Sequence, residues 1–389
     1  MKKKLLVLGE SYMNVQMKTN PPQKDEEVTY GASYSFHPYG AGSMTAISAA
    51  KLGANCVFCT KLGDDAYGER LKAYYNACGL TLSTEKLVKN AQTGLGLTLY
   101  NDITIGHTYV TKGANLHFTK QDVDHAFAYN PDMFVLPQDD ILSQIAGLEA
   151  APPEVPKPSV CEDDDEDTTF IPHCETGERP MAETTMKVAP DGELEDFSET
   201  IVFSNDAPTE ELKRMQAEES RNLVLYAARL AASRNTDIVV QYNKYTSKLL
   251  LGELDGIKIL VIDEDMLREA SGINPVSIDK TLRALIPLSA KIKAKYYIVQ
   301  QGNDTSFVYD GQYYEIVKIP PLLKAKARQK YPRMHGTYIG ALAMRFLETR
   351  DIIDACKYAS IASILTESKF GCLDHAPSRA EISKFTSEQ

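Results

Sequence analysis

The chain has 389 residues, of which 43% are hydrophobic and 24% charged, proportions typical of a globular protein with room for a sizeable core. No apolar run reaches the eighteen or more residues of a membrane-spanning helix, which argues against a helical membrane protein. The seven cysteines form an odd number without the spacing of a disulfide framework, so we expect reduced thiols and a cytoplasmic protein.

The net charge of −11 is unevenly distributed. Residues 162–219 contain 19 acidic and 4 basic side chains, so the rest of the chain carries about +4. The only basic run, 324–330, lacks interleaved aromatic residues and is expected to be a solvated connector. Without a dense basic face, nucleic acid is not an expected partner.

The first 138 residues alternate between strand-like and helix-like patterns. Strands are expected at 5–9, 55–61 and 133–137, and helices at 43–52, 71–79 and 120–128. Two further stretches, 10–36 and 92–112, predict a small β lid. This half therefore resembles a series of βα units with a hairpin lid.

The helix expected at 43–52 follows a glycine loop. Gly40 and Gly42 allow a tight turn or a close approach to another surface. Ala46 and Ala49 keep the helix narrow, and its N-terminus offers unpaired N–H groups to a polar ligand. This stretch is the first candidate for a binding site.

Cys56 and Cys59 form a C-x-x-C pattern inside the strand expected at 55–61. A metal or redox pair is one interpretation, but no second pair accompanies it. Two core residues are the favoured prediction.

Residues 139–219 interrupt the alternating pattern with prolines, threonines and concentrated negative charge. This composition predicts an acidic, disordered insertion in a domain formed by 1–138 and 220–389. A metal-binding loop or a segment that binds a protein partner remain alternatives. The run Asp163–Asp165 lacks the spaced ligands of a calcium loop.

The second half resumes the alternation after the insertion. Helices are expected at 223–233, 264–271, 279–286, 336–347 and 351–365, strands at 237–241, 256–261 and 296–300, and a hairpin at 306–315. The whole pattern predicts an α/β fold built from βα units.

Several motifs resemble the ribokinase-like (PfkB) sugar kinases. The chain has a glycine loop before a small-residue helix that ends in Leu52-Gly53-Ala54, followed by Gly63-Asp64-Asp65 and Gly68. The resemblance covers about 2–138 and 222–380. It implies a three-layer fold with a β lid, a sugar or nucleoside ligand, ATP and Mg²⁺ if the protein is active, and a homodimer formed through the lid.

On the substrate side, the resemblance implies ligand-binding roles for Asn14, Gly40, Gly42, Met44 and Asn115. Asn14 stands where the family has a sugar-binding aspartate, so it can form hydrogen bonds but carries no charge. Met44 stands where the family usually has an asparagine. Asn115 belongs to a Gly-Ala-Asn sequence that the family keeps near its sugar pocket.

The family's catalytic base is an aspartate at the start of a late helix, and Gly336 stands at that position. Glycine cannot accept a proton. His335 is a weak substitute, because one residue along a helix turns the side chain by about 100°. Arg333 and Met334 replace small residues beside the expected phosphate site.

The nucleotide side departs from the family in the same way. The residues implied to bind nucleotide or phosphate are Asp263, Gly302, Arg333, Gly336 and Ser360. Met266 stands where the family has a glutamate that organises the metal, Gly302 begins a loop that has lost its second glycine, and Ser360 replaces an asparagine. No residue is assigned as a metal ligand.

These substitutions favour a kinase homologue with lost or impaired phosphoryl transfer that acts as a ligand-binding or regulatory protein. Two alternatives remain open. One is an active sugar or nucleoside kinase with an unusual base, and the other is a structural or assembly protein that uses the acidic insertion.

Overall fold

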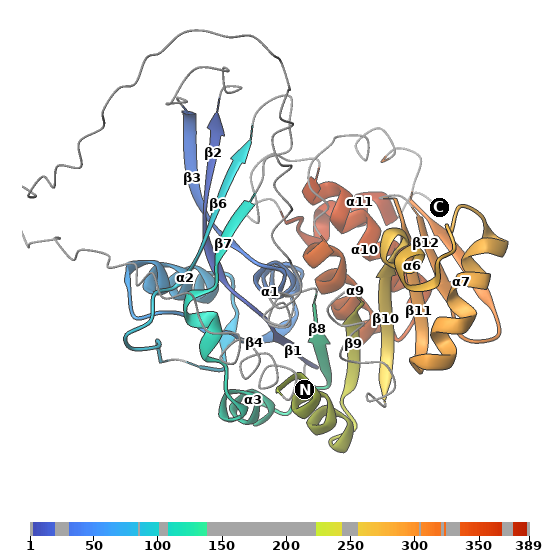
Figure 1. Ribbon diagram of the computed structural model, residues 1–389, viewed down its shortest axis with the longest axis horizontal. Helices are drawn as coiled ribbons and strands as arrows, with labels where there is room; N and C mark the ends of the chain where they lie inside the picture. Colours follow the sequence, from blue (N-terminus) through green and yellow to red (C-terminus); the bar gives the residue numbers. More distant parts are fainter. Residues whose placement is uncertain are drawn as a thin grey trace, which may run out of the picture.

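The computed structural model describes residues 3–19, 31–84, 86–100, 108–137, 223–242, 256–302, 305–319, 323, 335–367 and 376–386. Within them, a nine-stranded sheet runs through the molecule in the order β13-β12-β11-β10-β9-β8-β1-β4-β5 (Figure 1). Its strands are β1 (Lys4–Leu8), β4 (Asn55–Cys59), β5 (Thr81–Leu82), β8 (Met133–Leu136), β9 (Asp237–Gln241), β10 (Ile257–Asp263), β11 (Ala294–Gln301), β12 (Thr305–Tyr309) and β13 (Tyr314–Lys318).

The strands from β11 to β5 are parallel, and the β12–β13 hairpin adds two antiparallel strands at one edge. Sequences such as KLLVL and MFVL are apolar throughout because both faces of a parallel sheet are covered. Leu5 and Val7 point into one apolar cluster, whereas Leu6 and Leu8 point into the other. The core therefore lies in two layers, one on each face of the sheet.

Helices cover both faces. On one side lie α1 (Ala41–Lys51), α2 (Ala66–Ala77), α9 (His335–Thr349), α10 (Ile352–Glu367) and α11 (Arg379–Thr386). On the other side lie α3 (Lys120–Phe127), a helix at 223–233, α6 (Glu264–Ser271) and α7 (Ile278–Lys291). This arrangement confirms the three-layer α/β fold that the sequence predicts.

A second sheet of four strands forms the lid, in the order β3-β2-β6-β7. It contains β2 (Tyr12–Thr19), β3 (Gly31–Tyr39), β6 (Gly94–Tyr100) and β7 (Thr108–Thr111), and it stands upright beside the main sheet (Figure 1). A short 3₁₀ helix, η1 (Gly113–His117), returns the chain from the lid to the main domain. The predicted lid is thus present, with β3 reaching Tyr39.

Several elements differ from the sequence prediction in length. The helix predicted at 279–286 is longer in the structure, where α7 continues through Pro287 to Lys291. A proline removes one helical hydrogen bond, and the burial of Leu288, the residue directly after it, favours continuation of the helix. Neither the short strand β5 nor the helix α11 was predicted from the sequence. The predicted acidic insertion at 139–219 lies outside the described residues.

Cys56 and Cys59 lie on opposite faces of the sheet, since each belongs to a different apolar cluster. They cannot share a metal ion or form a disulfide with each other. The free cysteines in the described part of the chain are Cys56, Cys59, Cys78 and Cys356. In the described ranges, no helix is long and apolar enough to cross a membrane.

Burial raises the pKa of the Cys59 and Cys356 thiols to about 12, and it also raises that of Cys56. The unfolded chain therefore loses these protons above a pH of about 9 while the folded chain retains them. We expect the free energy of unfolding to fall with rising pH above 9, by up to about 1.4 kcal/mol per pH unit for each thiol.

Urea unfolding at pH 8, 9 and 10 measures this slope. Cys59→Ala should flatten it, and Cys78→Ala, at a half-buried thiol, serves as the control for side-chain loss. An identical slope in the wild type and Cys59→Ala would contradict the assignment.

Candidate functional site

The base of the lid meets the start of α1 at the carboxyl end of β1. Gly40 precedes α1 with a φ of 111°, and a Cβ at this position would lie 2.7 Å from the carbonyl oxygen of Glu10. The Tyr12 ring lies 3.1 Å from the same point. Glycine is therefore required here, and the first residues of α1, including Gly42, are packed beside the lid base.

Asn115 ties the end of the lid to the main domain. Its Oδ1 accepts a hydrogen bond from the Ser11 backbone N–H at 3.0 Å, and its Nδ2 donates to the carbonyl oxygens of Ser11 and Lys112, both at 2.8 Å. Both amide N–H groups are thus used within the protein. The side chain fixes η1 against the segment that links β1 to β2.

Beside this clamp lies a buried polar network. The Glu10 side chain is almost fully buried and accepts hydrogen bonds from the Tyr12 hydroxyl and from Lys112 Nζ, the latter at 3.2 Å. The Tyr75 hydroxyl lies 2.5 Å from Ser11 Oγ and 2.7 Å from Ser43 Oγ. A buried carboxylate needs such partners, so the network holds the lid base in one arrangement.

The lid carries a row of uncharged polar groups on the side that includes Tyr12. Asn14 is 1% exposed and donates from Nδ2 to Thr98 Oγ1 at 3.0 Å, which in turn lies 2.9 Å from Thr108 Oγ1. Gly96 leaves room for the Asn14 amide, since a Cβ there would lie 2.7 Å from its Oδ1. His37 pairs with Asn14 across the β2–β3 ladder.

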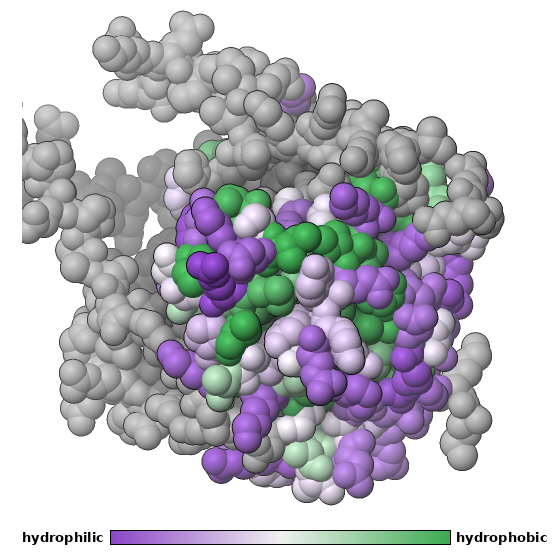
Figure 2. Space-filling view, turned by 90° about the vertical axis from the view of Figure 1, so that its right-hand side faces the viewer, coloured by the Kyte–Doolittle hydropathy of each residue, from purple (hydrophilic) through white to green (hydrophobic). Residues whose placement is uncertain are grey.

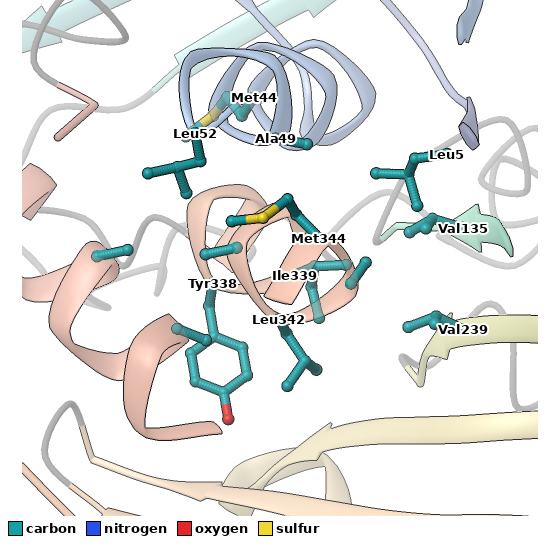
Figure 3. Packing of buried hydrophobic residues seen from close by; sticks show 14 of the residues in the cluster. Leu5, Met44, Ala49, Leu52, Val135, Val239, Tyr338, Ile339, Leu342 and Met344 are labelled. Carbon is teal, nitrogen blue, oxygen red and sulfur yellow. The ribbon is translucent and has the colours of Figure 1, made fainter. Parts of the chain in front are cut away.

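The second feature of the site is the crossing of α1 and α9. A Cβ on Gly336 would lie 2.6 Å from Met44 Cβ and 3.1 Å from the Ala41 carbonyl oxygen. A Cβ on Gly340 would lie 2.4 Å from the Thr45 carbonyl oxygen. Figure 3 shows the two helices packed through apolar side chains, with Met44 on α1 and Met344 on α9.

This crossing leaves no space for a side chain at 336. The obstacle is a Cβ atom and a backbone carbonyl rather than the flexible end of a side chain, so only a shift of one helix would create room. The buried pair Ser48 Oγ and Thr337 Oγ1, 3.2 Å apart, further joins the helices. Both glycines on this face of α9 therefore serve the close approach.

At the ends of β10 and β11, the predicted nucleotide residues bind other parts of the protein. Asp263 caps α6 by accepting a hydrogen bond from the Met266 N–H at 2.7 Å. Gly302 has a φ of 58° and donates its N–H to Glu264 Oε1 at 3.3 Å. Among the described residues, no group of three or more His, Cys, Asp or Glu side chains could hold a metal ion.

Ser360 lies on α10 and is 4% exposed. Its Oγ lies 3.4 Å from Ser306 Oγ, which is 2.9 Å from the Tyr338 hydroxyl. Burial raises the pKa of Tyr338 well above its ordinary value, so this hydroxyl stays protonated. Arg333 and the side chain of His335 lie outside the described residues.

The structure thus brings Asn14, Gly40, Gly42, Met44 and Asn115 to the region where the lid base meets α1, and Gly336 touches Met44. Asp263 and Gly302 lie at the ends of neighbouring strands. Sequence reasoning missed the Glu10–Lys112 pair. The Gly9-Glu10 sequence was visible, but nothing in the sequence indicated its distant partner.

The sequence model for the pfkB family carbohydrate kinase matches residues 2–146. A bifunctional ribokinase/ribose-5-phosphate isomerase A from Fructilactobacillus sanfranciscensis is 28% identical over 165 residues, and the Bacillus subtilis ribokinase is 29% identical over 128 residues. These stretches cover 41% and 32% of this chain but only 27% and 41% of the two relatives.

The similarity in fold, unlike the similarity in sequence, covers the whole chain. The structure of Arabidopsis thaliana ribokinase complexed with ribose and ATP superposes with a TM-score of 0.66 at 15% identity and covers 100% of both chains. At this identity the superposition establishes the fold and not the activity.

The close packing of α1 and α9 at Gly336 predicts how a substitution there changes the stability of the protein. Helix propensity alone predicts that Gly336→Ala stabilises α9 by about 1 kcal/mol. The contact with Met44 Cβ predicts the opposite sign, with a loss of about 1–3 kcal/mol from overpacking.

Urea unfolding of the variant decides between the two signs. Gly272→Ala is the control, because a Cβ there meets nothing within 4 Å and costs only the left-handed backbone strain, about 1–2 kcal/mol. A stabilised Gly336→Ala protein would show that the helices are not in close contact.

Proposed function

Because the chain belongs to the ribokinase-like PfkB family, we propose that it is a sugar-kinase homologue that binds a sugar or nucleoside but has lost most of its phosphoryl transfer. The single observation that carries this proposal is the packing at Gly336, where neither a base nor room for one exists. Such a protein would act by binding its ligand or by regulating a partner.

Phosphoryl transfer to an alcohol requires a group that positions the hydroxyl and takes its proton. In this family the residue at the start of α9 supplies that group, and here it is a glycine with no space around it. The side chain of His335, the substitute base suggested by the sequence, lies outside the described residues. The proposed absence of a base at this position thus follows from how closely α1 and α9 pack.

The proposed ligand is an uncharged polyhydroxy compound. The row formed by Asn14, Thr98 and Thr108 offers hydroxyl and amide groups but no charge. Hydrogen-bonding groups of this kind suit a sugar hydroxyl, which both donates and accepts. A relative with the same fold was crystallised with ribose and ATP, which supports the choice of ligand class.

ATP with Mg²⁺ is the proposed cofactor of any remaining activity, with Asp263, Gly302, Arg333, Gly336 and Ser360 as the proposed nucleotide side. The contacts of Asp263 and Gly302 within the protein would have to be exchanged for contacts with phosphate. Weak nucleotide binding is therefore part of the proposal.

A homodimer through the lid is the proposed assembly. The lid face opposite Asn14 is apolar: Val15 pairs with Phe36 on one side and with Leu97 on the other, and Leu97 pairs with Tyr109. Tyr34, Leu97 and Tyr109 are 67%, 37% and 64% exposed. An exposed apolar face of this kind marks an interaction surface, and a second lid would bring the same apolar side chains to it.

Ligand binding without turnover is the first expected result. A sugar panel should include one compound that raises the melting temperature, because a ligand at 100 times its Kd stabilises by about 2.7 kcal/mol. With Mg-ATP added, none should cause ADP release. Asn14→Leu should abolish the shift, whereas Asn76→Leu, at an exposed position, should not. Sugar-dependent ADP release would contradict the proposal.

A substitution on the exposed apolar face of the lid tests the proposed lid dimer. Leu97→Asp should convert a wild-type dimer into a monomer in sedimentation velocity, because a buried charge opposes lid packing. Tyr313→Asp, at a 73% exposed position in the β12–β13 hairpin, should leave the dimer intact. A monomeric wild type at micromolar concentration would refute the lid dimer.

A further inference from the structure

A carboxylate accepts the backbone N–H of Gly302, a residue of the proposed nucleotide side. Gly302 follows β11, and its N–H donates a hydrogen bond to Glu264 Oε1 at 3.3 Å. Glu264 is the first residue of α6, directly after β10. Figure 1 shows α6 at the tip of β10, so the contact lies at the carboxyl end of two neighbouring parallel strands. Open α/β sheets bind their ligands outside this edge.

The backbone conformation of Gly302 suits an anion site. Its φ of 58° lies in the left-handed region, which glycine adopts without a steric penalty. Backbone N–H groups in turns of this kind bind anions. The hydrogen bond to Glu264 is exposed, so a solute can reach the N–H group. The Glu264 carboxylate is therefore an internal competitor of any phosphate that binds there.

The sheet and the start of α6 together hold Glu264 in place. Asp263 pairs with Gln300 in the register of β10 and β11, which brings the residues that follow each strand side by side. Asp263 also accepts a hydrogen bond from the Met266 N–H at 2.7 Å and so fixes the first turn of α6. The Glu264 residue is half-buried. Its carboxylate is thus placed at Gly302 by ordered structure on both strands.

The charges at this edge oppose a second anion. Asp263, Glu264 and Asp265 are consecutive carboxylates, and Arg268 is the only basic residue of α6. Arg268 pairs with Asp265 at 2.9 Å, so its charge is already balanced within the helix. Figure 2 faces the end of the molecule that carries α6 and α7, and its coloured surface is mostly hydrophilic, as expected where charged side chains meet solvent.

From these contacts we propose that Glu264 sets a low affinity for phosphate-bearing ligands, because its carboxylate occupies the position that a phosphate oxygen would take at Gly302. A carboxylate and a phosphate cannot both accept the same N–H at close range, since like charges repel each other. The ligand must therefore displace Glu264. The inference rests on the proposed function in one respect, which is that Gly302 belongs to the nucleotide side.

Calorimetric titration with Mg-ATP tests the proposal. Glu264→Gln and Glu264→Ala should each bind Mg-ATP about tenfold or more tightly than the wild type, because the like charge beside the phosphate is gone. Glu269→Gln removes the same charge from an exposed position on the same helix, and it should change the affinity by less than about twofold, because solvent screens that charge. Inorganic pyrophosphate should give the same order of affinities, since the effect acts on phosphate.

Hydrogen exchange at the Gly302 amide tests the contact without any ligand. In protein labelled with nitrogen-15 glycine, this amide should exchange about threefold to tenfold faster in Glu264→Ala than in the wild type, because the acceptor is lost. Glu264→Gln keeps a side-chain oxygen that can accept the same bond, so its rate should be intermediate. Glu269→Gln should exchange at the wild-type rate.

Two results would overturn the inference. Equal affinity for Mg-ATP in the wild type and in Glu264→Ala, whether weak or tight, would mean that Glu264 does not control phosphate binding. An unchanged exchange rate at Gly302 would mean that the contact does not form in solution. Circular dichroism should confirm that each variant folds, since the Asp263 cap of α6 remains intact in all of them.

Neither result bears on the proposed sugar binding, which the melting-temperature panel measures without nucleotide. A protein that binds no sugar would fail the proposed function, and the affinities of the Glu264 variants for Mg-ATP would still decide the role of this carboxylate. A wild type that binds Mg-ATP with micromolar Kd, as tightly as Glu264→Ala, would refute that role even if a sugar binds.

Discussion

The close crossing of α1 and α9 is the constraint on which the site depends. Gly336 and Gly340 remove two side chains from one face of α9, and the backbone and Cβ atoms of α1 occupy the space. The crossing lies in one of the two apolar layers, so it contributes to folding as well as to the shape of the site. A base at the start of α9 and this crossing exclude each other.

The lid base shows how the rest of the site is held. Asn115 binds the segment after β1, Glu10 is buried with Lys112, and the Tyr75 hydroxyl joins two serines from different elements. Buried polar groups with complete hydrogen bonding specify one arrangement, because leaving any of them unpaired costs about 1–3 kcal/mol. The lid therefore keeps its orientation over α1.

Much of the fold could be predicted from the sequence because its patterns are local. The apolar strands, the small-residue helix after Gly40 and the hairpin at 306–315 each follow from residues close together in the chain. The separation of Cys56 and Cys59 also follows from strand alternation. The length of α7 did not follow, because the burial of Leu288 outweighs the effect of Pro287.

The site was harder to predict because its contacts join distant residues. The resemblance predicted that Gly336 stands at the position of the family's base, but the contact of this glycine with Met44 depends on how two helices pack. Similarly, Asn115 was predicted as a ligand residue, and its two bonds to the backbone of Ser11 became visible only in the structure. Its role toward a sugar stays a prediction.

The measurement that tests the central claim most directly is the activity and stability of Gly336→Asp. This variant restores the carboxylate expected from the family at its own position. The account predicts a protein destabilised by several kcal/mol, because a buried carboxylate meets Met44 and the Ala41 carbonyl, and no sugar-dependent ADP release from Mg-ATP. A variant with unchanged stability that releases ADP in the presence of a sugar would show that the position accepts a base, and it would contradict the account.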